Sequence, residues 1–274
     1  RTNTCGAVAA FAALKQLAQT SDVQMFARVS DDQGTLNVVP LGLMAMHQEA
    51  GQNVFVHDIR LTQPVAQEAL EDTGCVSDWT FLLPSDLDGF TPEQLELPSS
   101  LADARVYRTL DDFLKRFVKA PDDAGPTGLL LLAHHLSGTL TTSGNDKLNF
   151  GQINRDLGQG SIAILSACKT GNLSDDTGMI RSLNEHGVDA MVATAFELDE
   201  KFGKVFAFNF AELVHSNAEP VTVGQAFNVA LSKTASDLGG IGYTPEQARG
   251  MSLELVLAGN PNLKICRAKA VPPH

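Results

Sequence analysis

The chain has 274 residues, enough for one large domain or two smaller ones, and 43% of them are hydrophobic. Its formal net charge is -12 and no cluster of Lys and Arg stands out, so a direct nucleic-acid partner is not expected. No apolar run approaches the roughly 20 residues that cross a bilayer, so no membrane partner is expected either. The composition is that of a soluble globular protein.

The four cysteines, Cys5, Cys75, Cys168 and Cys266, are far apart and form no Cys-x-x-Cys pair. This spacing predicts neither a zinc site nor a disulfide framework. Sparse, unpaired cysteines are typical of a reducing compartment, so a cytoplasmic location is expected. The chain begins with Arg1 rather than Met, as expected for a piece of a larger protein.

The first part of the chain gives a mixed pattern of elements. Alanine-rich sequence predicts a helix over 4–19, and two extended runs around Asp-Asp-Gln-Gly predict a hairpin within 24–40. Alternation predicts a strand over 53–61, whereas residues rich in Pro, Asp, Gly and Ser predict long surface loops over 73–100. Apolar residues at helical spacing predict a helix over 106–119.

The pattern becomes regular after 120–128, the expected internal boundary. Three apolar runs predict buried strands at 129–135, 161–168 and 189–196. Helices are predicted around them, at 150–157, 176–187, 198–214 and from Thr222, where Thr-Val-Gly-Gln matches a capping box. This alternation predicts an α/β fold with a mostly parallel, doubly wound central sheet covered by helices.

Reactive side chains stand where two of these strands end. The first run closes with His134 and His135, and the second closes with Cys168. Because ligands bind at the carboxyl edge of an open α/β sheet, these residues can supply a base and a nucleophile there. A nearby imidazolium lowers the pKa of a cysteine thiol. Backbone N–H groups in the turn after His135 and at Cys168 could hold an oxyanion.

Each of these residues also has an ordinary structural interpretation. A lone cysteine at the end of a buried strand is more often an inert, small hydrophobic residue. Successive side chains of a strand point to opposite faces, so only one of His134 and His135 should reach the site.

Several sequence blocks occur in the order of a known family. LLLLAHH at 129–135 precedes LSACKTG at 165–171, and GVDAMVATAFELDE at 187–200 and LELVLAGNPNLKI at 253–265 follow. Over about residues 125–265, this order resembles the CHAT domain, a branch of the caspase-like cysteine peptidases.

The resemblance implies a caspase-like three-layer α/β/α sandwich. Residues 1–120 would be its N-terminal part, a candidate pseudo-caspase half, and residues 121–274 its catalytic part. The family pattern makes Cys168 the nucleophile and His135 its acid–base partner, with no cofactor and no metal. Leu136 replaces the family's Gly, whose backbone N–H would hold the oxyanion together with that of Cys168.

The resemblance also implies a protein substrate and a companion sensor domain or partner that switches the protease on in bacterial signalling or defence. Four acidic residues, Asp175, Asp176, Glu197 and Asp199, could receive a basic substrate side chain, although carboxylates at helix N-termini commonly stabilise the helix dipole. Two alternatives stay open. A catalytically silent caspase-like scaffold is favoured by Leu136, and an amidase-like cysteine hydrolase is disfavoured because the cysteine lacks a G-x-C-x-G elbow.

Overall fold

The computed structural model describes residues 26–30, 36–40, 75–118, 125–136, 139–143, 146–149, 156–167, 170, 179–194, 198–252, 255–260 and 262–269. The helix predicted over 4–19 and the strand predicted over 53–61 lie outside these residues. Strands β1 (Phe26–Ser30) and β2 (Leu36–Pro40) pair antiparallel, which confirms the predicted hairpin.

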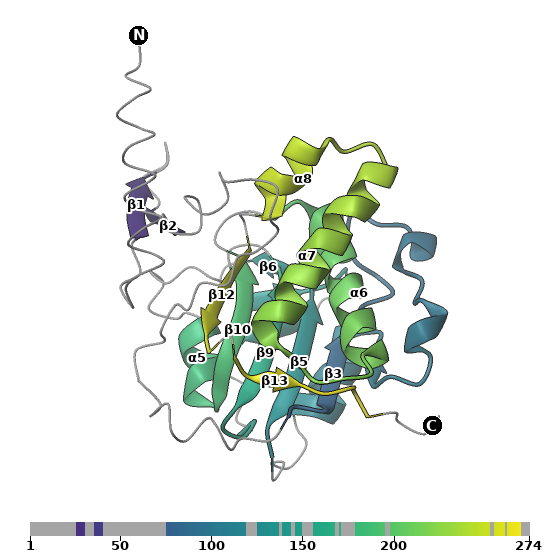
Figure 1. The fold of residues 1–274 in the computed structure, drawn as a ribbon. Helices are drawn as coiled ribbons and strands as arrows, with labels where there is room; N and C mark the ends of the chain where they lie inside the picture. Colours follow the sequence, from purple (N-terminus) through teal and green to yellow (C-terminus); the bar gives the residue numbers. More distant parts are fainter. Residues whose placement is uncertain are drawn as a thin grey trace.

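The centre of the molecule is a six-stranded sheet of the order β12-β10-β9-β5-β3-β4 (Figure 1). Five strands run parallel, and the edge strand β12 runs antiparallel to β10. The strand bounds are Asp78–Leu82 for β3, Val106–Tyr107 for β4, Thr127–Leu132 for β5, Ser161–Ser166 for β9, Val188–Thr194 for β10 and Leu255–Gly259 for β12.

The three predicted apolar strands are therefore present as β5, β9 and β10, and every residue of the three is buried. Strand β3 was not predicted, because the segment 73–100 was expected to form surface loops. In the structure Trp79 and Phe81 of β3 are almost completely buried between β5 and β4. The segment 120–128 consequently connects strands that belong to one sheet.

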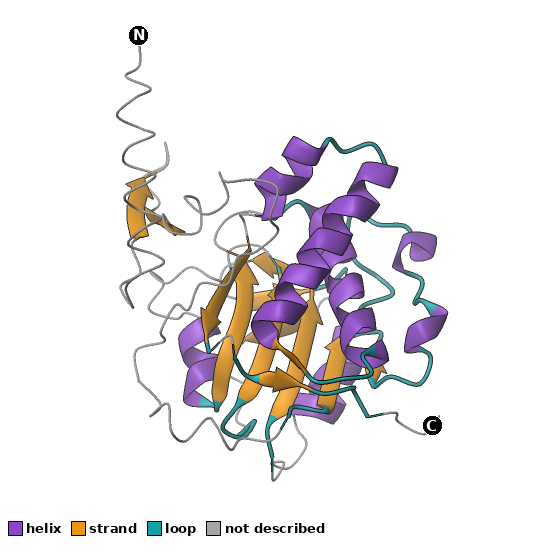
Figure 2. Ribbon diagram, viewed as in Figure 1, coloured by secondary structure: helices purple, strands orange, loops and turns teal. Residues whose placement is uncertain are grey.

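Helices cover both faces of the sheet (Figure 2). Because neighbouring strand residues point to opposite faces, the core divides into two clusters. Leu130, Ile162 and Val192 pack with the aromatic residues of α6 and α7, whereas Leu129 and Leu165 pack with α4 and α5. These three layers confirm the predicted α/β/α sandwich with a mostly parallel sheet. The helix bounds are Leu110–Phe113 for α4, Met179–Glu185 for α5, Glu200–Ser216 for α6, Val223–Gly240 for α7 and Pro245–Ser252 for α8.

Sequence and structure differ at several helix ends. The helix predicted over 106–119 begins only at Leu110, because Thr109 caps it by accepting a hydrogen bond from the Asp112 N–H, and it continues as a π-helical turn, Leu114–Val118. Residues 156 and 157, within the predicted helix 150–157, are not helical, and 150–155 lie outside the described residues. The predicted capping box at Thr222 is confirmed at the start of α7.

Short elements complete the described residues. A small antiparallel sheet follows β5, with bounds His134–Leu136 for β6, Thr139–Thr141 for β7 and Lys147–Asn149 for β8. Strands β11 (Val221–Thr222) and β13 (Lys264–Ile265) pair near the C-terminus, and 3-10 turns span Pro92–Leu95 and Ser99–Leu101. None of the helices in the described ranges is long and apolar enough to cross a membrane.

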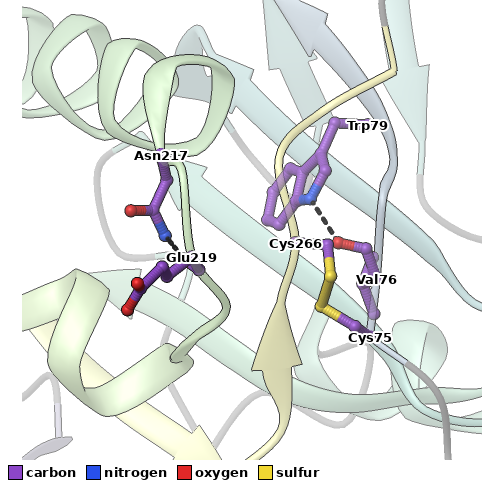
Figure 3. Close-up of a disulfide and its surroundings, with 6 residues drawn as sticks. All are labelled: Cys75, Val76, Trp79, Asn217, Glu219 and Cys266. Atoms are coloured by element: carbon purple, nitrogen blue, oxygen red, sulfur yellow. Dashed lines mark hydrogen bonds between the residues drawn. A yellow bond between two sulfur atoms is a disulfide. The ribbon is translucent and has the colours of Figure 1, made fainter.

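A disulfide joins Cys75 to Cys266 (Figure 3). This bond corrects the prediction of unpaired cysteines. The segment after β13 lies beside the start of β3, where Val76 donates its N–H to the Lys264 carbonyl and accepts one from the Cys266 N–H, both at 2.9 Å. The two cysteines are 191 residues apart in sequence, so their spacing gave no sign of the pairing.

Candidate functional site

The sheet order places a topological switch point between β3 and β5. Numbered along the chain, the five parallel strands have the order 2-1-3-4-5, with β3 and β5 as strands one and three. In this order the chain leaves β3 toward one edge of the sheet and later continues from β5 toward the other. Open α/β sheets bind their ligands at such a point, outside the carboxyl ends of the strands.

The histidine-bearing and cysteine-bearing strand ends meet beside this point. Leu132 of β5 pairs with Ser166 of β9, and one residue further the Ala133 N–H donates to the Ser166 carbonyl at 3.3 Å. The expectation that these two strands are neighbours is thus confirmed. His134 and His135 follow Ala133 directly, and Cys168 comes two residues after Ser166 in the chain.

The two histidines are half-buried residues of β6, where His134 pairs with Thr141 and His135 with Leu140. The Nε2 of His134 lies 3.1 Å from the backbone carbonyl of Asp88. Because a carbonyl can only accept, Nε2 carries the proton in this contact. The contact ties His134 to the loop after β3, and alternation along β6 directs His135 to the opposite face.

Position 136 differs from the sequence expectation of a turn directly after His135. Leu136 belongs to β6 and pairs with Thr139. A strand is a backbone conformation that any residue adopts, so no glycine is required there. The described glycines that have a positive φ, such as Gly89 and Gly158, all lie elsewhere in the chain.

Buried hydroxyl groups hold the described residues that flank Cys168, which itself lies outside the described residues. Before it, the Ser166 hydroxyl donates to the Gly203 carbonyl of α6 at 2.8 Å. After it, the N–H of Thr170 donates to Oγ1 of Thr194, the last residue of β10, at 3.1 Å. The end of β9 is thus fixed both to α6 and to β10.

Of the four acidic residues proposed to bind substrate, the structure describes only Asp199; Asp175, Asp176 and Glu197 lie outside the described residues. Asp199 is the N-cap of α6 and accepts a hydrogen bond from the Phe202 N–H at 2.9 Å. Burial raises the pKa of Tyr243, and the nearby Asp199 carboxylate, which accepts a hydrogen bond from the phenol, raises it further. Asp199 therefore has the helix-capping role that the sequence left open.

Sequence reasoning missed the contribution of the segments that follow β3 and β4. Besides the Asp88 carbonyl that contacts His134, Asp86 accepts at its carbonyl from the Ser143 N–H at 3.4 Å. Arg108 donates through Nη2 to the Leu95 carbonyl at 2.6 Å. Burial lowers the pKa of Arg108, and the Asp86 charge opposes this shift. A run rich in Asp, Gly and Pro gave no signal that it borders the histidines.

Comparisons with solved structures give likenesses at low sequence identity. A structure described as a protease aligns at a TM-score of 0.50 and 11% identity, covering 83% of this chain and 54% of that chain. The complex of Porphyromonas gingivalis RgpB pro- and mature domains aligns at a TM-score of 0.47 and 12% identity, covering 72% of this chain and 50% of that chain. The Arg-specific cysteine proteinase gingipain R aligns at a TM-score of 0.47 and 11% identity, covering 69% of this chain and 48% of that chain.

This chain therefore spans about half the length of the solved structures it matches. The alignment with the protease at 0.50 agrees with the fold class predicted from the sequence, and at this identity it shows the fold alone. No protein-family model and no curated protein matches the chain.

Proposed function

We propose that the chain is a caspase-like cysteine endopeptidase with Cys168 as nucleophile and His135 as acid–base partner. The observation that supports this most directly is the hydrogen bond from the Ala133 N–H to the Ser166 carbonyl. It brings the ends of β5 and β9 together, so the residues that follow leave the same edge of the sheet. His135 holds the histidine position of the family pattern, and alternation along β6 sets it on the face opposite to His134.

The mechanism follows from thiol chemistry. The Cys168 thiolate attacks the scissile carbonyl carbon, and the tetrahedral oxyanion is held by backbone N–H groups at Cys168 and Leu136. The C–N bond then breaks as the protonated His135 gives its proton to the leaving amine, which leaves a thioester. His135 next takes a proton from water, whose oxygen attacks the thioester and releases the second product and the thiolate.

The substrate is a protein or peptide, and a companion domain or partner protein would control access to the site in bacterial signalling or defence. Asp175, Asp176 and Glu197 remain candidates for contacting a basic substrate side chain. Asp199 is a weaker candidate, because it is occupied by the Phe202 N–H and by Tyr243.

A catalytically silent scaffold is the second candidate, and one observation favours it. Leu136 is paired with Thr139 in the β6–β7 ladder. Backbone N–H groups of paired strands commonly donate to the neighbouring strand. An N–H of Leu136 that donates to Thr139 would not be available to an oxyanion. A scaffold would keep the fold and bind partners without hydrolysing them.

The deciding experiment compares wild type with Cys168→Ala on a fluorogenic peptide library. The protease proposal expects hydrolysis by wild type and none by the variant, with equal thermal unfolding of the two. Equal hydrolysis by both preparations would point to a contaminant, and no hydrolysis by either would favour the scaffold.

A further inference from the structure

Two buried threonines form a closed set of hydrogen bonds on either side of the strand end that carries Cys168. Thr170 and Thr194 are 2% and 0% exposed. The N–H of Thr170 donates to Oγ1 of Thr194, and the N–H of Thr194 donates to Oγ1 of Thr170, both at 3.1 Å. Both hydroxyls reach the Ala167 carbonyl, Thr170 at 3.2 Å and Thr194 by a shorter contact.

One arrangement of the protons directs both hydroxyls to the carbonyl. Each hydroxyl has a single proton and accepts one N–H from the other threonine. If both donate to the Ala167 carbonyl, every N–H, both hydroxyls and the carbonyl are satisfied. The 3.2 Å contact between the two hydroxyl oxygens then needs no proton of its own. We refer to Thr170, Thr194 and the Ala167 carbonyl as the threonine clamp.

We propose that Thr170 and Thr194 are positioning residues for catalysis, because they hold the chain at Ala167 and at Thr170, on either side of the nucleophile; this inference rests on the proposed function. A trans peptide unit is planar from one Cα to the next, and its C=O and N–H point in opposite directions. Two hydroxyls that hold the Ala167 carbonyl therefore constrain the plane of the peptide unit that follows Ala167, and this unit supplies the proposed oxyanion donor.

The clamp also holds the chain at Thr170, two residues after Cys168. Ala167 and Thr170 are both bonded to Thr194, so only residues 168 and 169 lie between two points attached to the same strand. A fixed donor that needs no rearrangement during the reaction stabilises the oxyanion more than a mobile one. Loss of the clamp should therefore lower kcat and leave KM almost unchanged.

The test uses a Cys5→Ser background without reductant, so that Cys168 is the remaining cysteine outside the Cys75–Cys266 disulfide. Thr194→Val removes one hydroxyl at nearly constant volume, and Thr194→Ser keeps it. The control is Thr234→Val on α7, where an equally buried hydroxyl donates to the Ala230 carbonyl at 2.7 Å, away from the strand ends. The readouts are kcat and KM on a cleaved peptide, and the rate at which iodoacetamide alkylates Cys168 as a function of pH.

We expect Thr194→Val to lower kcat about 100-fold with little change in KM, as for small displacements of reacting groups, and to move the alkylation profile to higher pH. Thr194→Ser should restore both, and Thr234→Val should change neither. A folded Thr194→Val with wild-type kcat and alkylation profile overturns the proposal. If Thr194→Val does not fold, Thr170→Val, which leaves the Thr194 bond to Ala167, decides by the same readouts.

The two proposals fail separately. If wild type hydrolyses no peptide, the protease proposal fails, but the alkylation profiles of wild type and Thr194→Val still decide whether the clamp positions the thiol. If wild type is active and the folded clamp variants are equally active, the clamp proposal fails and the protease proposal stands.

Discussion

Cys75 and Cys266 are bonded through their sulfur atoms, with their Cα atoms 5.3 Å apart. The bond joins a residue shortly before β3 to the residue directly after β13 (Figure 3). Beside it, the Trp79 indole donates to the Val76 carbonyl at 3.2 Å, so the bond lies next to the hydrophobic core. Disulfides persist in oxidising environments, so the cysteines of this chain give no support for a cytoplasmic location.

Removal of the disulfide should destabilise the domain. The double variant Cys75→Ala/Cys266→Ala is expected to lose about 2–5 kcal/mol of unfolding free energy, because the bond closes a very long loop and restricts the unfolded chain. Urea unfolding with and without dithiothreitol measures this: reductant should lower the midpoint of wild type and of the control Cys5→Ser, which both keep the bond, and should leave the midpoint of the double variant unchanged. Identical midpoints for wild type and the double variant without reductant would show that the bond adds nothing to stability.

The two adjacent histidines should differ sharply in their effect on hydrolysis. His135→Ala is expected to lower kcat about 10²–10⁴-fold, the range for loss of a general acid–base group. His134→Ala removes only the hydrogen bond to the Asp88 carbonyl, so its main effect should be a loss of about 1 kcal/mol of stability. Measuring kcat and thermal unfolding of both variants separates the roles. If His134→Ala were inactive and His135→Ala active, His134 would be the catalytic histidine.

An unpaired buried hydroxyl offers a stabilising substitution. Oγ1 of Thr80 on β3 is completely buried and has no hydrogen-bond partner among the residues that the structure describes. Valine has almost the same shape without the polar atom, so Thr80→Val should raise the unfolding free energy by about 1 kcal/mol. The urea midpoint should rise with an unchanged m-value. The matched control is Thr234→Val, which removes a bonded hydroxyl and should lower the midpoint; a lower midpoint for Thr80→Val would contradict the absence of a partner.

Sequence patterns predicted the fully buried strands and the helices that carry apolar residues at helical spacing. β5, β9 and β10 are apolar throughout, and α6 and α7 repeat aromatic and aliphatic residues at helical spacing, so their place in the core could be predicted from the sequence. β3 could not, because it is only five residues long and lies between polar and glycine-rich segments. Its burial comes from pairing with β5 and β4, which no window of sequence contains.

The site shows the same limit. The ends of the apolar runs identified Cys168 and the histidine pair, and their neighbouring strands are confirmed. The partners of these strand ends, such as Asp88 beside His134 and Thr194 beside Ala167, come from other elements of the sheet. In the sequence, Thr194 is distinguished only as a polar residue in the mostly apolar run 189–196. Its bonding role depends on the register between β9 and β10, which the sequence does not specify.

Asp189 should make stability depend on pH at the opposite edge of the sheet. It is buried at the start of β10, and its carboxylate accepts a hydrogen bond from the Gly160 N–H at 2.7 Å. Burial raises the pKa of Asp189, and the Gly160 N–H opposes this shift. The folded protein therefore holds this proton more tightly than the unfolded chain. As the pH rises from about 4 through the folded pKa, ionisation of Asp189 reduces stability.

Asp189→Asn keeps an oxygen that can accept from the Gly160 N–H and removes the charge. The variant should be more stable than wild type at pH 7, and the difference should shrink toward zero as the pH falls below about 4, where wild-type Asp189 is protonated. Urea unfolding between pH 3 and pH 8 measures both curves. Asp156→Asn is the matched control, because its exposed carboxylate also accepts from a glycine N–H, that of Gly158 at 2.8 Å. If Asp189→Asn were less stable than wild type at pH 7, the fold would depend on the charge that burial disfavours.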